Sequence, residues 1–458
     1  MSHSPTNGYS QPSARSLTLG NTATVAVVSC LLLMATTMIS LPGTAEDKRF
    51  SQPVNRIENV RLFRDGKLTD PLEIIISEGY ISRIGPNSDT DIKGGKSNST
   101  TSPQVIDGTG LVALPGLIDG HTHSYGTALR DALQFGVTTN LDMFTASDAL
   151  PEAIKARAAR TKTNNADLFS SGMIATAPGG HGTQFSSGVV TLEDAQSVDE
   201  WVAARKREGS DYIKLAYIPG NKSRNSIDRT IARALINAGH QQGLQVLAHI
   251  STANAARDMV EEGIDGLVHI FADRPIDQAL VDLMVTSKTF VVPTLSIIAS
   301  VDAKKAETQI TPPSESLASR LSPMQQSSLK QGFRKATPGY SLTQALSNVD
   351  ALHAAGVPIL AGSDAPNPGT AHGYTLHNEL ALLTRAGLSP SQAVAAASSV
   401  TARIFKLEGR GRLEQGAIAD LILISGDPTK DISNTLNIQH IIKNGYPVQP
   451  NANSNKAQ

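Results

Sequence analysis

The chain has 458 residues, with 40 Lys and Arg against 41 Asp and Glu, a net charge of −1 and a hydrophobic content of 40%. This composition excludes a long disordered or collagen-like chain, and the length fits one large barrel domain plus one small domain. So balanced a charge provides no basic surface for a phosphate backbone and no polybasic patch for lipid headgroups. We therefore expect neither nucleic acid nor a stable membrane partner.

The N-terminal region contains the most apolar stretch of the chain, residues 23–41, which carries no charge. Arg15 precedes it and small residues follow at 43–45, an order typical of a secretory signal peptide. We predict a signal peptide over residues 1–45 and export to the periplasm or the medium. A retained membrane anchor is the alternative, because 19 uncharged residues can span a bilayer. Since Cys30 is the single cysteine, the mature chain would contain no disulfide and no Cys nucleophile.

Both ends of the mature chain show the alternating pattern and the turn residues of short β-strands, without a helical period. The runs at the N-terminal end are 58–63, 72–77 and 80–84, and those at the C-terminal end are 419–424 and 440–442. We therefore predict one small β-sandwich domain built from residues 46–113 and 409–448. The polar, Asn-rich residues 449–458 are expected to be a tail.

Eight short apolar runs, each followed by a stretch of helical composition, lie between those two ends. They are residues 114–119, 137–144, 168–175, 212–218, 245–250, 266–270, 290–295 and 358–364. Eight such units predict an α/β fold with a (β/α)8 TIM-type barrel over residues 114–408. In that architecture the chemistry collects at the carboxyl ends of the strands, so the residues found there are the candidate site.

Six residues with metal-binding or titratable side chains stand at or near the ends of these strands. They are His121, His123, Lys214, His249, His269 and Asp364. Alternation along an extended strand directs the first two imidazoles to the same side. Four neutral imidazoles and one carboxylate are a nitrogen and oxygen ligand set that suits zinc or a similar divalent ion.

Lys214 lies within an apolar central strand, where an unpaired ammonium group is unfavourable. Burial lowers the pKa of a lysine amine, so a neutral amine beside two cations could take up carbon dioxide. The resulting carbamate is an anion that could bridge both ions. A structural lysine that extends to the barrel mouth is the alternative.

Several motifs together resemble the metal-dependent amidohydrolase superfamily. In chain order they are LPGLIDGHTH at 114–123, Lys214, His249, His269, LAGSD at 360–364, and the closing segments 388–403 and 411–421. The resemblance covers about residues 54–448. Within the superfamily the chain looks most like the imidazolonepropionase-like branch, which contains prolidase-like dipeptidases with a carboxylated lysine, partly because of PGGHG at 178–182.

The resemblance implies a centre with two divalent ions, zinc being the expected metal. His121, His123 and Asp364 would bind one ion and His249 and His269 the other, while Lys214, carboxylated by carbon dioxide, and a hydroxide would bridge them. Asp364 would also accept the proton released during attack and deliver it to the leaving nitrogen.

The expected reaction is hydrolysis of an amide C–N bond in a small molecule, namely a peptide, an N-acyl amino acid or a cyclic amide. A phosphotriesterase- or lactonase-like hydrolase with the same centre is the alternative, and a metal-binding protein without turnover is a third. Nothing in the sequence excludes a homo-oligomer.

Substrate contacts are expected from the loops after strands three and four. The resemblance suggests that His181 binds the substrate carbonyl or carboxylate, although an exposed histidine in a Gly-rich turn fits as well. Tyr217 and Arg224 follow strand four, and Arg224 could bind a carboxylate through two hydrogen bonds or could be a solvated surface charge. The long connection over residues 296–357 is expected to form part of the pocket. His372 and His377 either face the mouth or pack.

Overall fold

The computed structural model describes residues 50–88, 103–186, 188–302, 313–331 and 341–450. The predicted signal peptide, its apolar run and most of the predicted tail lie outside these residues. Within the described ranges, no helix combines the length and the hydropathy needed to cross a bilayer. The domain boundaries proposed from the sequence stay a prediction.

Strands from both ends of the chain form one nine-stranded sheet. Its order is β16-β15-β14-β6-β1-β3-β4, and β2 and β5 also pair with β1. The bounds are β1 (Val54–Arg64), β2 (Lys67–Leu68), β3 (Leu72–Ser77), β4 (Tyr80–Gly85), β5 (Gln104–Asp107), β6 (Leu111–Pro115), β14 (Leu421–Ser425), β15 (Ile438–Lys443) and β16 (Tyr446–Pro447). The antiparallel pairing of β14 with β6 joins the two ends, whereas the two-layer sandwich stays a prediction.

Two tight turns show why this sheet forms where the sequence alternates. Asp65 and Gly66 connect β1 to β2 with φ values of 49° and 77°, and Asn444 and Gly445 connect β15 to β16 with 53° and 79°. Positive φ at both central residues matches the right-handed twist of a hairpin, and Asp-Gly and Asn-Gly adopt it at little cost. These pairs therefore fix the register of both hairpins.

The central region alternates parallel strands with helices, as predicted. One three-stranded sheet contains β7 (Leu117–Thr122), β8 (Val137–Asp142) and β9 (Asp167–Ser170), and a four-stranded sheet contains β10 (Ile213–Ala216), β11 (Val246–His249), β12 (Gly266–Val268) and β13 (Phe290–Val292). Seven of the eight predicted runs are thus strands in the described residues. The run 114–119 is divided at Gly116, where an added Cβ would lie 2.3 Å from the Thr138 hydroxyl oxygen. The run 358–364 contains one single bridge, at Ile359.

Isolated single bridges connect the parallel sheets and the segment that follows β13 to one another. Ala175 pairs with Leu215 of β10, Ile359 pairs with Val291 of β13, and Ala365 pairs with Thr122 of β7. The contacts follow the neighbour order that a closed barrel requires, and closure itself stays a prediction.

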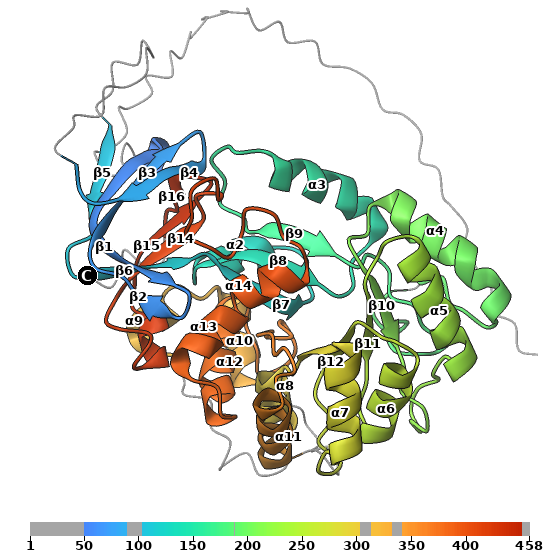
Figure 1. Cartoon of the computed structure of the whole chain (residues 1–458). Coiled ribbons are helices and arrows are strands. Elements are labelled where there is room, and N and C mark those ends of the chain that lie inside the picture. The colour runs from blue at the N-terminus through green and yellow to red at the C-terminus, as the bar shows by residue number, and fades with distance from the viewer. Residues whose placement is uncertain (1–49, 89–102, 187, 303–312, 332–340, 451–458) are drawn as a thin grey trace, which may run out of the picture. The chain divides into compact units, whose positions relative to one another are not determined.

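Thirteen labelled helices lie in the described residues (Figure 1). They are α2 (Ala128–Leu133), α3 (Leu150–Ala158), α4 (Val198–Glu208), α5 (Arg229–Gln241), α6 (Ala253–Glu261), α7 (Gln278–Ser287), α8 (Leu295–Val301), α9 (Glu315–Ala318), α10 (Pro323–Lys330), α11 (Leu342–Ala354), α12 (Tyr374–Arg385), α13 (Pro390–Ala396) and α14 (Ser399–Ile404). Side-chain caps start several of them, as where the Asp228 carboxylate accepts from the Ile231 amide at 2.8 Å. The long connection after β13 therefore contains helices α8 to α11.

Candidate metal centre

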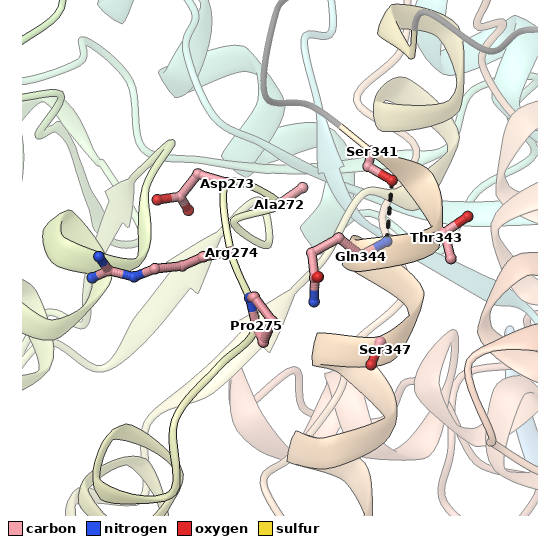
Figure 2. Close-up of a pocket in the computed structure, with 8 residues that line it drawn as sticks. All are labelled: Ala272, Asp273, Arg274, Pro275, Ser341, Thr343, Gln344 and Ser347. Atoms are coloured by element: carbon pink, nitrogen blue, oxygen red, sulfur yellow. Dashed lines mark hydrogen bonds between the residues drawn. The ribbon is translucent and has the colours of Figure 1, made fainter.

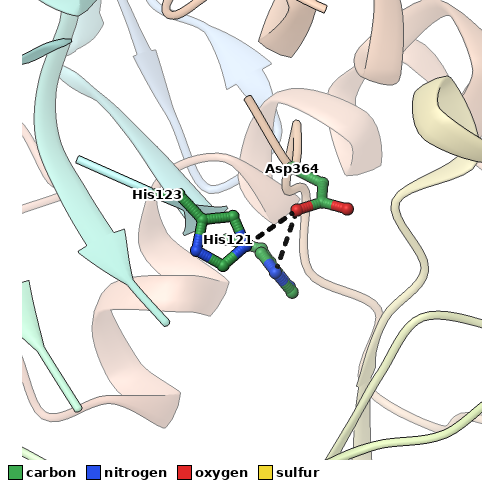
Figure 3. A group of neighbouring side chains, drawn as sticks. All are labelled: His121, His123 and Asp364. Atoms are coloured by element: carbon green, nitrogen blue, oxygen red, sulfur yellow. Dashed lines mark ion pairs between the residues drawn. The ribbon is translucent and has the colours of Figure 1, made fainter. Parts of the chain in front are cut away.

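Three predicted ligands meet at the end of β7. His121 is in the strand and His123 follows it, so alternation places both rings on one side, where the carboxylate of Asp364 faces both (Figure 3). Asp364 Oδ1 is 3.3 Å from His121 Nε2 and 3.2 Å from His123 Nε2. One ligand atom from each residue lies within 4.8 Å of the others, which is a spacing that a single cation can span.

Unpartnered buried atoms mark this group. His121 Nδ1 and Asp364 Oδ1 are buried and have no hydrogen-bond partner in the part of the chain that the structure describes. Such atoms are rare in folded proteins, because each costs desolvation free energy. The imidazoles of His121 and His123 and the carboxylate of Asp364 form a nitrogen and oxygen donor set that fits a divalent cation.

The electrostatics favour the ligand forms of these side chains. Burial lowers the pKa of His121 well below its usual value, and the charge of Lys214 lowers it further. Burial alone would raise the pKa of Asp364, but the neighbouring histidines outweigh it and hold that pKa well below its usual range. A neutral imidazole and an ionised carboxylate are the forms that bind a metal.

A second histidine pair adjoins the first group. His249 ends β11, His269 follows β12, and His269 Nε2 is 3.1 Å from His249 Nδ1. The ring centroids of His121 and His269 are 4.9 Å apart, so the two groups are neighbours. Burial lowers the pKa of His249 well below its usual value and that of His269 to about 4.

Lys214 lies in β10, which pairs with β11, the strand that ends at His249. Its side chain is buried, and burial lowers its pKa to about 7 against the opposing charges of Asp364 and Asp142. Its charge is a lesser cause, after burial, of the lowered pKa of both His121 and His249.

The backbone is strained at two of these residues. His269 and Asp364 have φ values of 67° and 53°, in the left-handed region that non-glycine residues seldom adopt. Strain of this kind persists only where surrounding contacts hold it, and it clusters at functional sites.

Two buried carboxylates that the sequence reasoning missed brace the site. Asp119 accepts from the His121 amide at 3.2 Å and from the Ser363 amide and hydroxyl at 2.9 and 2.6 Å. It therefore ties β7 to the segment that carries Asp364. Asp142 similarly accepts from the Ser124 amide at 2.6 Å. Both lie in or at the end of predicted strands, where a buried carboxylate is itself a signal.

The predicted substrate residues are distributed differently. His181 stacks on His249 with centroids 4.4 Å apart, and burial lowers its pKa to about 3. The Tyr217 hydroxyl donates a hydrogen bond to the Asp258 carboxylate of α6 at 2.8 Å, so this hydroxyl already has a partner within the protein. Arg224 lines an open depression of about 660 Å³ between the loops after β9 and β10.

The two remaining histidines have distinct surroundings. His377 bonds Thr435 Oγ1 and the Phe135 carbonyl, both at 2.9 Å, which accounts for it as a packing residue. His372 is buried and makes a hydrogen bond to the backbone of His123, and burial lowers its pKa to about 4.

The long connection lines another depression. Figure 2 shows residues 272–275, just after β12, opposite the start of α11, around an open space of about 620 Å³. Ser341 Oγ caps α11 by accepting from the Gln344 amide at 3.3 Å. None of the six predicted ligands lines either of these two depressions.

Comparison with known sequences gives a family match over most of the chain. The model of the amidohydrolase family matches residues 112–448. An uncharacterised protein of Mycobacterium tuberculosis and one of Mycobacterium bovis are each 28% identical over 250 residues, which is 52% of this chain. The match spans only 58% of the length of these curated relatives.

Solved structures are similar over a larger share of the chain. A Xaa-Pro dipeptidase with bound methionine in its active site has a TM-score of 0.67 and 21% identity, over 86% of this chain and 99% of that one. A prolidase complexed with N-methylphosphonate-L-proline has a TM-score of 0.67 and 20% identity, over 86% and 99%. Ochratoxinase of A. niger has a TM-score of 0.66 and 19% identity, over 87% and 96%. At these identities the likeness shows a common fold.

Proposed function

Because this chain belongs to the amidohydrolase family, we propose that it is a binuclear metal-dependent hydrolase that cleaves an amide C–N bond in a small molecule. The observation that carries the proposal is the convergence of His121, His123 and Asp364 beside the pair of His249 and His269. The proposal also includes the fold predicted from the sequence, a closed (β/α)8 barrel with these residues at its mouth and a β-sandwich domain.

In this proposal His121, His123 and Asp364 hold one divalent cation, with zinc preferred, and His249 and His269 hold the second. When bound, such ions lower the pKa of a coordinated water toward ~7 and polarise the scissile carbonyl. The amine of Lys214, freed of its proton by burial, forms a bond to the carbon of carbon dioxide and loses a proton. The carbamate anion would then replace a neutral amine by a negatively charged group that can face both metal sites.

The remaining steps belong to side chains of the chain itself. Asp364 Oδ1, which has no hydrogen-bond partner in the described residues, accepts a proton during attack and delivers it to the leaving nitrogen. His181, which stacks on His249, is assigned to bind a substrate oxygen. Arg224 supplies a cation in the neighbouring depression for a substrate carboxylate.

The solved relatives guide the choice of substrate. A dipeptidase and a prolidase are among the similar structures, which supports a dipeptide or N-acyl amino acid with a free carboxylate as the first substrate class to test. Export of the protein would place this hydrolysis outside the cytoplasm.

The test is an activity screen of the zinc-loaded protein against dipeptides including Xaa-Pro, N-acyl amino acids, cyclic amides, lactones and phosphotriesters. We expect turnover of at least one amide substrate, lost after chelation and restored by zinc. Substrates with the carboxylate blocked as an amide should have a lower kcat/KM, because a charge-assisted contact is lost. Turnover of lactones or phosphotriesters without any amide hydrolysis would overturn the assignment.

A further inference from the structure

The ring of His269 is oriented by one hydroxyl group. His269 Nδ1 lies 2.7 Å from Thr294 Oγ1, and the same hydroxyl donates to the Pro293 carbonyl at 2.8 Å. Since the hydroxyl proton is used on the carbonyl, the oxygen accepts the Nδ1–H of His269. The lone pair is thereby left on Nε2, which faces His249 Nδ1 at 3.1 Å. A partner on the far nitrogen of a metal-binding histidine sets both its tautomer and its direction.

Thr294 reaches this position only through an unfavourable backbone conformation. It is the residue before α8 and has φ 50° and ψ 49°, in the left-handed region. A β-branched residue there is an outlier, so neighbouring contacts must hold it in place. Its own side chain makes no capping bond to α8.

Glu379 of α12 provides those contacts. Its side chain is fully buried, and its two oxygens accept from the amides of Leu295 and Ser296 at 2.8 Å each. The Ser296 hydroxyl donates a third bond at 2.8 Å. A buried carboxylate is tolerated only when donors satisfy it, and here the donors are the two residues directly after Thr294.

We propose that Glu379 is a positioning residue for the metal centre, acting through Thr294 on the ring of His269. The inference rests on the proposed function in that His269 serves there as a metal ligand. Glu379 touches neither the ligand ring nor the reacting atoms. Glu379 fixes the backbone of residues 294–296 and thereby the position of the Thr294 hydroxyl. That hydroxyl in turn directs Nε2 of His269 toward His249.

The first experiment compares Glu379→Gln with a matched control. The control is Asp302→Asn, because Asp302 is also buried, follows the other end of α8, and accepts from the Leu342 amide at 2.7 Å. Zinc affinity is measured by competition with a chromogenic chelator, without substrate. We expect one of the two ions to bind about 10- to 100-fold more weakly in Glu379→Gln, and both ions to bind normally in the control. Equal affinities in wild type and Glu379→Gln would overturn the proposal.

A second pair of variants keeps the test decisive if Glu379→Gln does not fold. Thr294→Ser retains the hydroxyl and should bind both ions normally, whereas Thr294→Val lacks it and should show the same loss as Glu379→Gln. Identical affinities in the two Thr294 variants would contradict the proposal.

A readout on the metal-free protein separates this inference from the proposed function. The ¹⁵N shifts of the His269 ring should report a proton on Nδ1 in wild type and a mixture of tautomers in Thr294→Val. If no substrate is ever turned over but this difference is seen, the hydrolase assignment fails and the positioning contact stands. If turnover is found and the ring shifts do not differ, the positioning role is wrong.

Discussion

Two of the groups of buried charged side chains in the described residues differ in how their polar atoms are paired. In the metal centre, His121 Nδ1 and Asp364 Oδ1 have no hydrogen-bond partner in the described residues. The second group, which we name the ion cluster, consists of Asp167, Arg410, Asp420 and Lys443, all at most 8% exposed. There every charge meets an opposite charge.

The ion cluster joins the nine-stranded sheet to β9. Arg410 Nη2 lies 2.6 Å from Asp167 Oδ2, and Lys443 Nζ lies 3.0 Å from that oxygen and 2.7 Å from Asp420 Oδ2. The Asn444 amide donates to the other oxygen of Asp420 at 2.7 Å. Complete pairing accounts for this cluster without a ligand, whereas the unpartnered atoms of the candidate metal centre are those that the proposed cation would satisfy.

The largest expected effect separates the two groups by activity. Asp364→Asn removes the carboxylate charge that faces two histidines, so the amount of bound zinc should fall. The value of kcat/KM should drop by more than about 100-fold, because loss of a residue that only contacts a metal ligand already costs up to that factor. Elemental analysis and steady-state kinetics measure both quantities. Asp420→Asn in the ion cluster should keep its zinc. Full zinc content in Asp364→Asn would show that Asp364 is no ligand.

The second prediction concerns Lys214. Wild type should contain about two metal ions per chain, and Lys214→Ala should retain one, because the carbamate that faces both metal sites is lost. Lys214→Arg should behave alike, since a guanidinium group stays cationic and forms no carbamate. Short carboxylic acids should partly restore activity to Lys214→Ala. Two tightly held ions and near-native kcat in Lys214→Ala would make this lysine structural.

The third prediction tests the ion cluster by stability. Arg410→Met leaves Asp167 with one partner instead of two, so the free energy of unfolding of the metal-free protein should fall by about 3–5 kcal/mol, as for other broken buried pairs. Urea denaturation measures the loss, and zinc binding by the folded protein should be unchanged. The matched control is Arg412→Met, whose half-exposed side chain lies 3.8 Å from Glu414 and should cost less than ~1 kcal/mol. Equal losses of unfolding free energy in Arg410→Met and Arg412→Met would contradict a stabilising role for the buried ion pairs.

The smallest effect is expected at a partly exposed ion group between α5 and α6. Glu262 accepts hydrogen bonds from Arg233 and Arg229, and these bonds, chiefly those of Arg233, lower its pKa from 4.5 to about 2 despite partial burial. Because the folded-state pKa is lower, the stabilisation is complete above pH 4.5 and is lost as the pH falls toward 2. Glu262→Gln should cost about 1 kcal/mol or less at pH 7, since both arginines are exposed to solvent. Urea denaturation at pH 7, 4 and 3 should show the difference between the two proteins shrinking; a constant difference would contradict the pairing.

The sequence predicted most of what depends on spacing along a strand. Alternation placed His121 and His123 on one side, and the order of parallel strands brought His249 next to His269. The pairing of the two chain ends also followed from their alternating pattern.

Contacts between residues far apart in the chain escaped prediction. Glu379 and Leu295 are 84 residues apart, and Arg410 and Asp167 are 243 residues apart, so no local pattern relates them. The left-handed backbone of Thr294 has no signature either, because glycine usually marks that conformation. Tyr217 lies just beyond the last residue of β10, where strand alternation no longer sets the direction of a side chain.

The pairing of β14 with β6 also constrains the order in which this protein can fold. The whole run of alternating strands and helices separates these two neighbours in the sequence, so their contact has a very large sequence separation. A growing chain can assemble the central strands while synthesis continues, but β6 keeps one open edge until β14 has been made. Completion of the nine-stranded sheet is therefore a late event in biogenesis, and loss of the C-terminal strands would expose an aggregation-prone strand edge.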